Sequence, residues 1–395
     1  MIIGGGLAGS KAALRLAAAG RNTLLIEKEK SAHHKVCGEF LSPEAVGYLR
    51  QAGINPVSLG AAPINRLRVS MGNHTVESQL PFTALSLSRH LLDEALLNRA
   101  ADEGCVVRRG FAVDKLTSDG ASWIAQLSNG ETVEARSAFL ATGKHDLRGW
   151  PREPTGHDLQ SDLVGFKLHW RLPPAQTAAL RYVMDLYLFR GGYGGISLVE
   201  QDIANLCLVV RKPVLRKLGG WPELLSTILS ENQLIRACLG SAQPLWDRPL
   251  AVSSIPYGLL GSPFSLQNLW ALGDQIAVIP SFTGDGMSIA LHSAALAAEM
   301  HLAGATPADY ERKLVGQLSR GMKLATALSR AIVRPLPRRA APLALSLFPH
   351  AMNWIAAATR IPATALVSDP PVRTCRAGIV DRDPLASVGK SGPEG

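Results

Sequence analysis

A glycine-rich turn at the start of the chain restricts the possible folds more than any other feature. Gly4 to Gly9 read Gly-Gly-Gly-Leu-Ala-Gly, after the apolar pair Ile2-Ile3. An alanine- and leucine-rich stretch, Ser10 to Ala19, follows the turn, and the apolar run Thr23 to Ile26 comes next. The order of strand, tight turn, helix and strand is typical of a right-handed parallel unit. We therefore predict that the chain begins as a βαβ unit of an α/β domain.

The spacing of the glycines inside this turn indicates a dinucleotide site. Gly4, Gly6 and Gly9 form Gly-x-Gly-x-x-Gly, in which the glycines allow a tight turn, approach of a pyrophosphate to the backbone, and close helix packing. The free N–H groups of the following helix N-terminus attract phosphate. Glu27 ends the second strand, where an acid accepts hydrogen bonds from an adenosine ribose. The alternative is a glycine-rich turn that binds no ligand.

The first strand is unusually short. Buried parallel strands usually have about five residues, whereas only Met1 to Ile3 precede the turn. We expect either a clipped strand or a natural start upstream of Met1.

A second glycine motif lies far downstream and distinguishes between the possible dinucleotides. It comprises Gly273-Asp274, then Pro280, then Gly284-Asp285-Gly286-Met287. With both motifs in this order, roughly residues 1 to 330 resemble the flavoprotein superfamily of p-hydroxybenzoate-hydroxylase-like monooxygenases and geranylgeranyl reductases. The resemblance implies FAD as the cofactor. It also implies that the Gly-Asp turn holds the ribityl and phosphate part of FAD, and that the Gly-x-Gly segment starts a helix against the flavin ring.

Two further segments match this superfamily. Arg89, in Leu87 to Asp93, resembles an arginine at a helix start that reaches the FAD phosphates; the alternative is a surface cation. Lys35 to Glu39 resemble the Lys-x-Cys-Gly segment of geranylgeranyl reductases, which implies that Cys37 lies beside the isoalloxazine; the alternative is a buried apolar thiol. The predicted cofactor-binding residues are Gly4, Gly6, Leu7, Ala8, Gly9, Glu27, Lys28, Lys35, Cys37, Gly38, Arg89, Thr142, Gly143, Gly273, Asp274, Pro280, Gly284, Asp285, Gly286 and Met287.

The sequence also departs from the hydroxylase pattern. Thr142 and Ser293 stand where aromatic hydroxylases carry aspartate, and both differences favour the reductase branch. No second Gly-x-Gly-x-x-Gly unit is present for NAD(P)H. We therefore expect NADH or NADPH to act as a transient electron donor. The Trp-x-Trp-x-Ile-Pro signature of flavin-dependent halogenases is absent.

Long apolar runs between about 161 and 254 indicate a second domain. They predict a mostly antiparallel sheet that holds the substrate, inserted into a Rossmann-like FAD-binding domain formed by residues 1–160 and 255–330. We predict a helical region at 331–385 and a flexible tail at 386–395. Tyr193 and Cys37 are the candidate catalytic residues; the alternative for Tyr193 is a tyrosine that serves packing. Tyr257, His34 and Glu39 are further candidates for hydrogen-bond or acid–base roles.

Composition limits the partners and the location. A formal charge of +9 favours anionic partners, but no nucleic-acid motif is present, so we expect no nucleic-acid partner. Five scattered cysteines without a Cys-x-x-Cys pair indicate neither a disulfide framework nor a metal site. Without a signal peptide or a long apolar segment, we expect a cytoplasmic protein. Peripheral membrane contact is predicted through a basic C-terminal region, with a helical lid as the alternative; its arginines are Arg330, Arg334, Arg338 and Arg339.

These features together predict an FAD-dependent oxidoreductase acting on a small hydrophobic or aromatic substrate. The first interpretation is a monooxygenase of secondary metabolism that hydroxylates or epoxidises its substrate through a flavin hydroperoxide. The alternative is a geranylgeranyl-reductase-like flavoprotein that reduces isoprenoid double bonds. An alternative of another class is a non-catalytic flavin-binding module.

Overall fold

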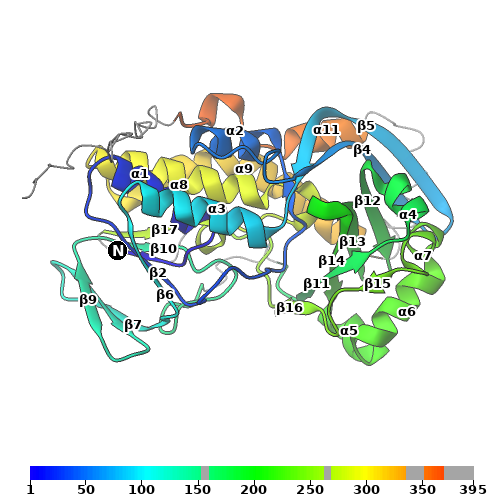
Figure 1. Cartoon of the computed structure of the whole chain (residues 1–395), viewed down its shortest axis with the longest axis horizontal. Coiled ribbons are helices and arrows are strands. Elements are labelled where there is room, and N and C mark those ends of the chain that lie inside the picture. The colour runs from blue at the N-terminus through cyan, green and yellow to red at the C-terminus, as the bar shows by residue number, and fades with distance from the viewer. Residues whose placement is uncertain (153–159, 262–267, 335–350, 369–395) are drawn as a thin grey trace, which may run out of the picture.

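The computed structural model describes residues 1–152, 160–261, 268–334 and 351–368. Outside these ranges lie Arg338, Arg339, Cys375 and most of the helical region predicted at 331–385. The described residues form three β-sheets and a set of covering helices (Figure 1).

A parallel sheet is the centre of the N-terminal part of the fold. Its strand order is β17-β10-β1-β2-β6, and every pairing is parallel. The predicted βαβ start and α/β class are therefore confirmed. The strands are β1 (Ile2–Ile3), β2 (Leu24–Glu27), β6 (Val106–Arg109), β10 (Ala138–Leu140) and β17 (Leu269–Ala271).

Both faces of this sheet are covered, as parallel strands require. Because side chains alternate along a strand, Ile2 packs against the helices while Ile3 packs against a small three-stranded sheet. The covering helices are α1 (Leu7–Ala18), α3 (Arg89–Asp102) and α8 (Gly286–Leu302), which lie together on one side in Figure 1. The small sheet consists of β7 (Val113–Ser118), β8 (Trp123–Leu127) and β9 (Thr132–Ala135).

A nine-stranded sheet forms the second part, with the order β15-β11-β14-β13-β12-β4-β5-β3 and β16 beside β11. Its pairings are antiparallel except for β12 with β4. The strands are β3 (Phe40–Leu41), β4 (Ala62–Met71), β5 (His74–Ser86), β11 (Leu163–Arg171), β12 (Tyr182–Phe189), β13 (Gly192–Leu198), β14 (Ile203–Arg211), β15 (Gln243–Pro244) and β16 (Leu250–Ser253).

The predicted boundary of 161–254 does not coincide with this sheet. Strands β3 to β5 come from the segment assigned to the FAD-binding domain, yet they extend the second sheet. The physical reason is that β12 would otherwise present an unpaired edge, which β4 satisfies along Val183 to Leu188.

The two faces of the large sheet have different neighbours. Leu206 and Leu208 on β14 pack against helices on the outer face, whereas Val209 points with Tyr193 to the opposite face. The helical stretch from Trp221 to Leu239 is broken at Asn232, whose side chain caps the second piece. The helices here are α4 (Pro174–Leu180), α5 (Lys212–Leu218), α6 (Trp221–Glu231) and α7 (Gln233–Leu239).

The remaining helices bridge the two parts. A capping box at Thr306 starts the long helix α9, and α11 lies against β5 (Figure 1). Among the described residues, no helix combines the length and apolar character needed to cross a bilayer. These elements are α2 (Pro43–Gln51), α9 (Pro307–Ile332), α11 (Ala351–Ala358) and the short 3-10 turns η1 (Glu200–Asp202), η2 (Gly273–Gln275), η3 (Ser281–Thr283) and η4 (Ala363–Ala365).

Candidate functional site

The first glycine turn is packed so closely that it tolerates no side chain at two positions. Gly4 has a φ of +106°, and a Cβ on it would lie 2.4 Å from the Ala141 carbonyl oxygen. A Cβ on Gly9 would lie 1.9 Å from the carbonyl oxygen of Gly4. No side chain caps the N-terminus of α1, whose N-cap is Gly6. The N–H groups of its first turn are therefore available to an anion.

Two cations converge on this helix start. A Cβ on Gly6 would lie 3.3 Å from Lys35 Nζ and 3.4 Å from Arg89 Nη2. Asp93 orients both cations: it accepts hydrogen bonds from Lys35 at 2.8 Å and from Arg89 at 2.6 and 2.8 Å. Burial opposes charge on Asp93, but Arg89 and Lys35 outweigh it and hold the pKa of this carboxyl below its usual range. The arrangement suits a pyrophosphate.

Glu27 lies at the end of β2 beside the same turn. Its Oε2 accepts a hydrogen bond from the Gly5 N–H at 2.6 Å, and its Oε1 accepts one from the Glu29 N–H at 2.9 Å. The carboxylate is 6% exposed and borders the cavity described next. It is therefore held in place beside the position where the ribose of a dinucleotide would lie.

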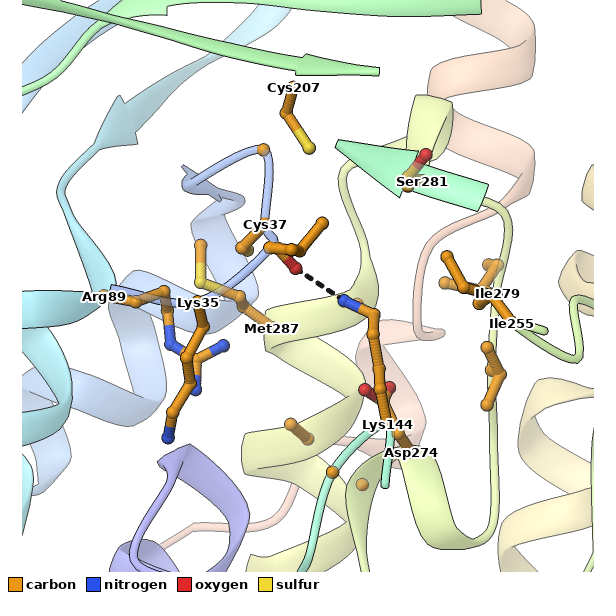
Figure 2. Close-up of a pocket in the computed structure, with 18 of the residues that line it drawn as sticks. Lys35, Cys37, Arg89, Lys144, Cys207, Ile255, Asp274, Ile279, Ser281 and Met287 are labelled. Atoms are coloured by element: carbon orange, nitrogen blue, oxygen red, sulfur yellow. Dashed lines mark hydrogen bonds between the residues drawn. The ribbon is translucent and has the colours of Figure 1, made fainter. Parts of the chain in front are cut away.

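One cavity of about 990 Å³ connects the two glycine motifs. Cys37, Met287, Lys144 and Asp274 surround its middle section (Figure 2). Of the predicted cofactor-binding residues, all line this cavity except Gly9, Pro280 and Asp285. The bare glycine turn, the paired cations and the cavity that continues past Cys37 and Met287 fit an FAD molecule.

The second glycine motif is held by its own hydrogen bonds. The Gly273 N–H donates to Ser293 Oγ at 2.9 Å, so the serine found in place of aspartate has a structural role. Arg152 donates to the Asp274 carbonyl at 2.6 Å. Asp285 is the N-cap of α8 and accepts a hydrogen bond from Thr359 at 3.0 Å. Burial raises the pKa of Asp285 to about 6, although Arg360 opposes this effect.

The loop around Thr142 meets the Lys35–Glu39 segment. Lys144 Nζ donates to the Val36 carbonyl at 2.7 Å, the bond drawn in Figure 2. Gly143 accepts a hydrogen bond from Gln275 at 2.7 Å. Thr142 lines the cavity and donates to the His145 carbonyl. Sequence reasoning did not select Lys144 or Gln275, since neither belongs to a motif.

Cys37 borders the central cavity. Its Sγ accepts a hydrogen bond from the Glu39 N–H at 3.3 Å, and its carbonyl accepts one from Asn205 at 3.2 Å. Cys207 points toward it from β14 (Figure 2). Burial raises the pKa of the Cys207 thiol to about 12.

Tyr193 also lines the cavity, near Tyr257 and Ser281. The Ser281 hydroxyl lies 3.5 Å from the Tyr193 hydroxyl. Burial raises the pKa of both tyrosines. They therefore remain neutral hydrogen-bond donors at ordinary pH.

Beyond these groups the cavity becomes an apolar chamber. Its walls come from β4, β5 and β12 on one side and from α9 and α11 on the other. The apolar residues of this chamber include Leu67, Val69, Leu80, Met184, Leu186, Leu188, Leu328, Ile332, Met352 and Ile355. A lining of this kind favours an apolar molecule over a polar one.

Glu39, named from the sequence as an acid–base candidate, is 0% exposed and has a φ of +59°. Lys167 and His169, both on β11, bind its carboxylate. Sequence reasoning missed these two residues because it treated β11 as an ordinary apolar strand. Their spacing, two polar residues on one strand face, was the available signal.

Comparisons with known proteins agree with this geometry. Residues 1–143 match the family model described as FAD binding domain. A curated menaquinone reductase of Mycolicibacterium smegmatis is 26% identical over 355 residues, which cover 86% of this chain and 85% of that protein. The flavin-dependent brominase Bmp2 has a similar structure, with a TM-score of 0.73 and 17% identity over 93% of this chain and 95% of that chain. A halogenase PltM mutant in complex with FAD has a TM-score of 0.69 and 14% identity, over 90% of this chain and 84% of that chain. At these identities the two solved structures show the fold alone.

Proposed function

We propose that this chain, whose residues 1–143 match the FAD binding domain family and which is similar to a menaquinone reductase over most of its length, is an FAD-dependent reductase of the p-hydroxybenzoate-hydroxylase-like flavoprotein superfamily. Its substrate is a long, unsaturated and mainly apolar molecule, and isoprenoid quinones are the first class to test. The observation that carries this proposal is the apolar chamber, which is continuous with the Cys37 and Met287 section of the cavity. A chamber of this kind matches a lipophilic chain better than a small polar substrate.

Each part of the cavity has a task in this reaction. Lys35 and Arg89 bind the cofactor phosphates, and Glu27 binds the ribose. FAD supplies the exchange of two electrons with the substrate. The hydroxyl of Tyr193 holds a proton at the entrance to the apolar chamber, where it donates to a substrate oxygen. The apolar walls orient the chain and exclude water.

Two observations favour reduction over oxygenation. The similarity to a menaquinone reductase extends over most of both chains, and Thr142 and Ser293 replace the aspartates of aromatic hydroxylases. The monooxygenase interpretation stays a prediction, because the same cavity also suits a hydrophobic substrate for oxygenation.

Substrate mass distinguishes the two reactions. FAD-loaded protein is reduced with dithionite without oxygen, separated from the remaining dithionite and mixed with menaquinone or a geranylgeranyl lipid, and the mass of the product is measured by mass spectrometry. A gain of two hydrogen atoms under anaerobic conditions is the expected result. Turnover that occurs only in air, with oxygen consumed and one oxygen atom gained, would replace the proposal with the monooxygenase.

The electron donor and the alternative of a non-catalytic flavin-binding module are tested under the same anaerobic conditions. NADH or NADPH as donor stays a prediction, checked by anaerobic bleaching of the flavin absorbance. Protein that holds FAD but whose reduced form is reoxidised by none of these substrates would favour the non-catalytic module.

A further inference from the structure

A cluster of ionisable side chains is buried beside the cavity, next to the N-terminus of α3. Glu39 is at its centre, with both carboxylate oxygens bonded. Oε1 accepts hydrogen bonds from Lys167 Nζ and, at 2.8 Å, from the Arg89 N–H. Oε2 lies 3.1 Å from His169 Nε2. Glu39 and Lys167 are 0% exposed and His169 is 3% exposed. Burying three such groups together carries a desolvation cost, which their pairing with one another offsets.

The backbone around Glu39 is constrained as strongly as its side chain. Its φ of +59° is the left-handed region, which costs a residue with a side chain about 1–3 kcal/mol. The Glu39 carbonyl accepts hydrogen bonds from the Leu87 N–H at 3.2 Å and from Ser86 Oγ at 3.1 Å. The Glu39 N–H donates to Cys37 Sγ. The cluster is therefore connected directly to the thiol that borders the cavity.

A histidine pair connects the cluster to the partly exposed edge of the protein. The ring of His34 lies 4.9 Å from that of His169 and 5.0 Å from that of His90, between ring centroids. His34 and His90 are both partly exposed. Nitrogen or oxygen atoms of His34, Glu39 and His169 all lie within 4.8 Å of one another, a separation that one water molecule bridges. His34 Nδ1 is buried and has no hydrogen-bond partner within the protein.

The geometry points to a proton path that runs from His90 and His34 through His169 to Glu39, and from Glu39 to the cavity beside Cys37. Glu39 and His34 line the cavity themselves. A flavin takes up protons with its electrons, so any redox reaction in the cavity needs such a supply. The path moves protons only: Lys167 or His169 gives a proton to the Glu39 carboxylate, which passes it to the cavity, and the donor regains a proton from solvent through His34.

The charged neighbours suit this role. Burial raises the pKa of Glu39, but Lys167 and His169 outweigh burial and hold it below its usual value. Burial, together with Lys167 and His169, lowers the pKa of His34 to about 4, so its ring is a neutral proton acceptor at ordinary pH. Lys167 and His169 face the path from β11, and Arg89 and His90 face it from α3. Cys37 faces it from the loop before β3, and Cys207 from β14.

The same three side chains resemble a metal-ligand set, but the charges argue against a metal. Lys167 has no exposure and already neutralises the Glu39 carboxylate. A divalent cation on His34, Glu39 and His169 would place two further positive charges beside that buried ammonium, with one carboxylate to balance them. A proton path requires no added charge.

Two substitutions test the path without disturbing the buried ion pair. His34→Phe keeps the ring and removes its nitrogens, and His169→Gln leaves Glu39 with Lys167. His301→Phe is the matched control, since its half-buried ring packs against Phe139 and Trp270 outside the cavity. Each FAD-loaded protein is reduced anaerobically with dithionite across pH 5 to 9, in H₂O and D₂O. The midpoint potential of the flavin is measured at the same pH values.

We expect flavin reduction at neutral pH to be at least about tenfold slower in the two path variants than in the wild type. We also expect the variants to lack the rate difference between H₂O and D₂O and the pH dependence of the rate that the wild type shows. The control keeps all three. The potential reports proton uptake even where electron transfer limits the rate, and its dependence on pH changes in His169→Gln. If only one variant folds with FAD, that variant decides.

Wild-type rates, D₂O ratios and potentials in the path variants would overturn the assignment. A stoichiometric metal ion found by elemental analysis of the purified protein would also overturn it. No substrate is added in this experiment, so its outcome is independent of the proposed reductase activity.

Discussion

The backbone N–H of Gly5 donates a 2.6 Å hydrogen bond to the carboxylate of Glu27. This bond joins the first turn of the glycine loop to the end of β2, so the acid and the phosphate-binding turn are oriented by each other. A Cβ on Gly5 would lie 3.0 Å from the same oxygen, Glu27 Oε2. The acid predicted to bind the ribose thus also supports the loop.

Glu27→Ala removes both contributions. Because a hydrogen bond to a charged group is worth about 1.5–3 kcal/mol, we expect the FAD dissociation constant to rise by roughly tenfold to a hundredfold. Titration of the apoprotein with FAD, followed by flavin fluorescence, measures it. Glu134→Ala, at an exposed site on β9, is the control. Unchanged affinity in Glu27→Ala would remove Glu27 from the cofactor site.

Gly6→Ala and Gly9→Ala separate cofactor binding from folding. Gly6 has a φ of −77°, which alanine adopts, but its Cβ would fill the space between Lys35 and Arg89. We expect a folded protein without bound flavin. Gly9→Ala would force the Cβ against the Gly4 carbonyl and should prevent folding. Circular dichroism and flavin absorbance read the two outcomes, and a yellow Gly6→Ala protein would contradict the phosphate assignment.

Asp285 makes the stability of the protein depend on pH. Burial raises its pKa to about 6 in the folded state, from a reference value of 3.8. Its contribution to stability is present below about pH 4 and is lost as pH rises through 6. Asp285→Asn should therefore gain up to about 3 kcal/mol relative to the wild type between pH 4 and pH 8.

Urea unfolding of the apoproteins at the two pH values measures this difference. Asp247→Asn, at an exposed position, controls for the loss of a carboxylate. A difference between Asp285→Asn and wild type that stays constant with pH would show that Asp285 is ionised throughout.

Two substitutions on α11 test whether the apolar chamber binds the substrate. Ile355 on α11 lines it, whereas Ala357 on the same helix is exposed and does not. Ile355→Trp should fill the chamber and raise the KM for a lipophilic substrate by tenfold or more, with the flavin spectrum unchanged. Ala357→Trp should behave as the wild type. Equal KM values for the two variants would place the substrate elsewhere.

Membrane contact through the C-terminal region remains a proposal. Trp354 on α11 is 62% exposed, and the basic Arg330 and Arg334 end the preceding described segment. We expect the protein to pellet with vesicles that contain phosphatidylglycerol, less so in high salt, and less so after Trp354→Ser. Absence of lipid-dependent pelleting at low salt would exclude the contact.

Local patterns were sufficient for much of the fold. The spacing of Gly4, Gly6 and Gly9 and the acid at Glu27 predict the turn, the first helix and the parallel strands, because these depend on neighbours close in sequence. The residues of both glycine motifs line one cavity, apart from Gly9, Pro280 and Asp285, and their role in binding FAD stays a prediction.

Contacts between distant segments were beyond the reach of such patterns. The pairing of β4 with β12 joins strands more than a hundred residues apart, and nothing local in either strand specifies the other. For the same reason, the role of Lys167 and His169 can be recognised only from the tertiary structure, in which β11 brings them into contact with Glu39. Sequence periodicity determines which side chains share a face; only tertiary packing determines which faces meet, because burial and charge pairing act between segments that the chain itself keeps apart.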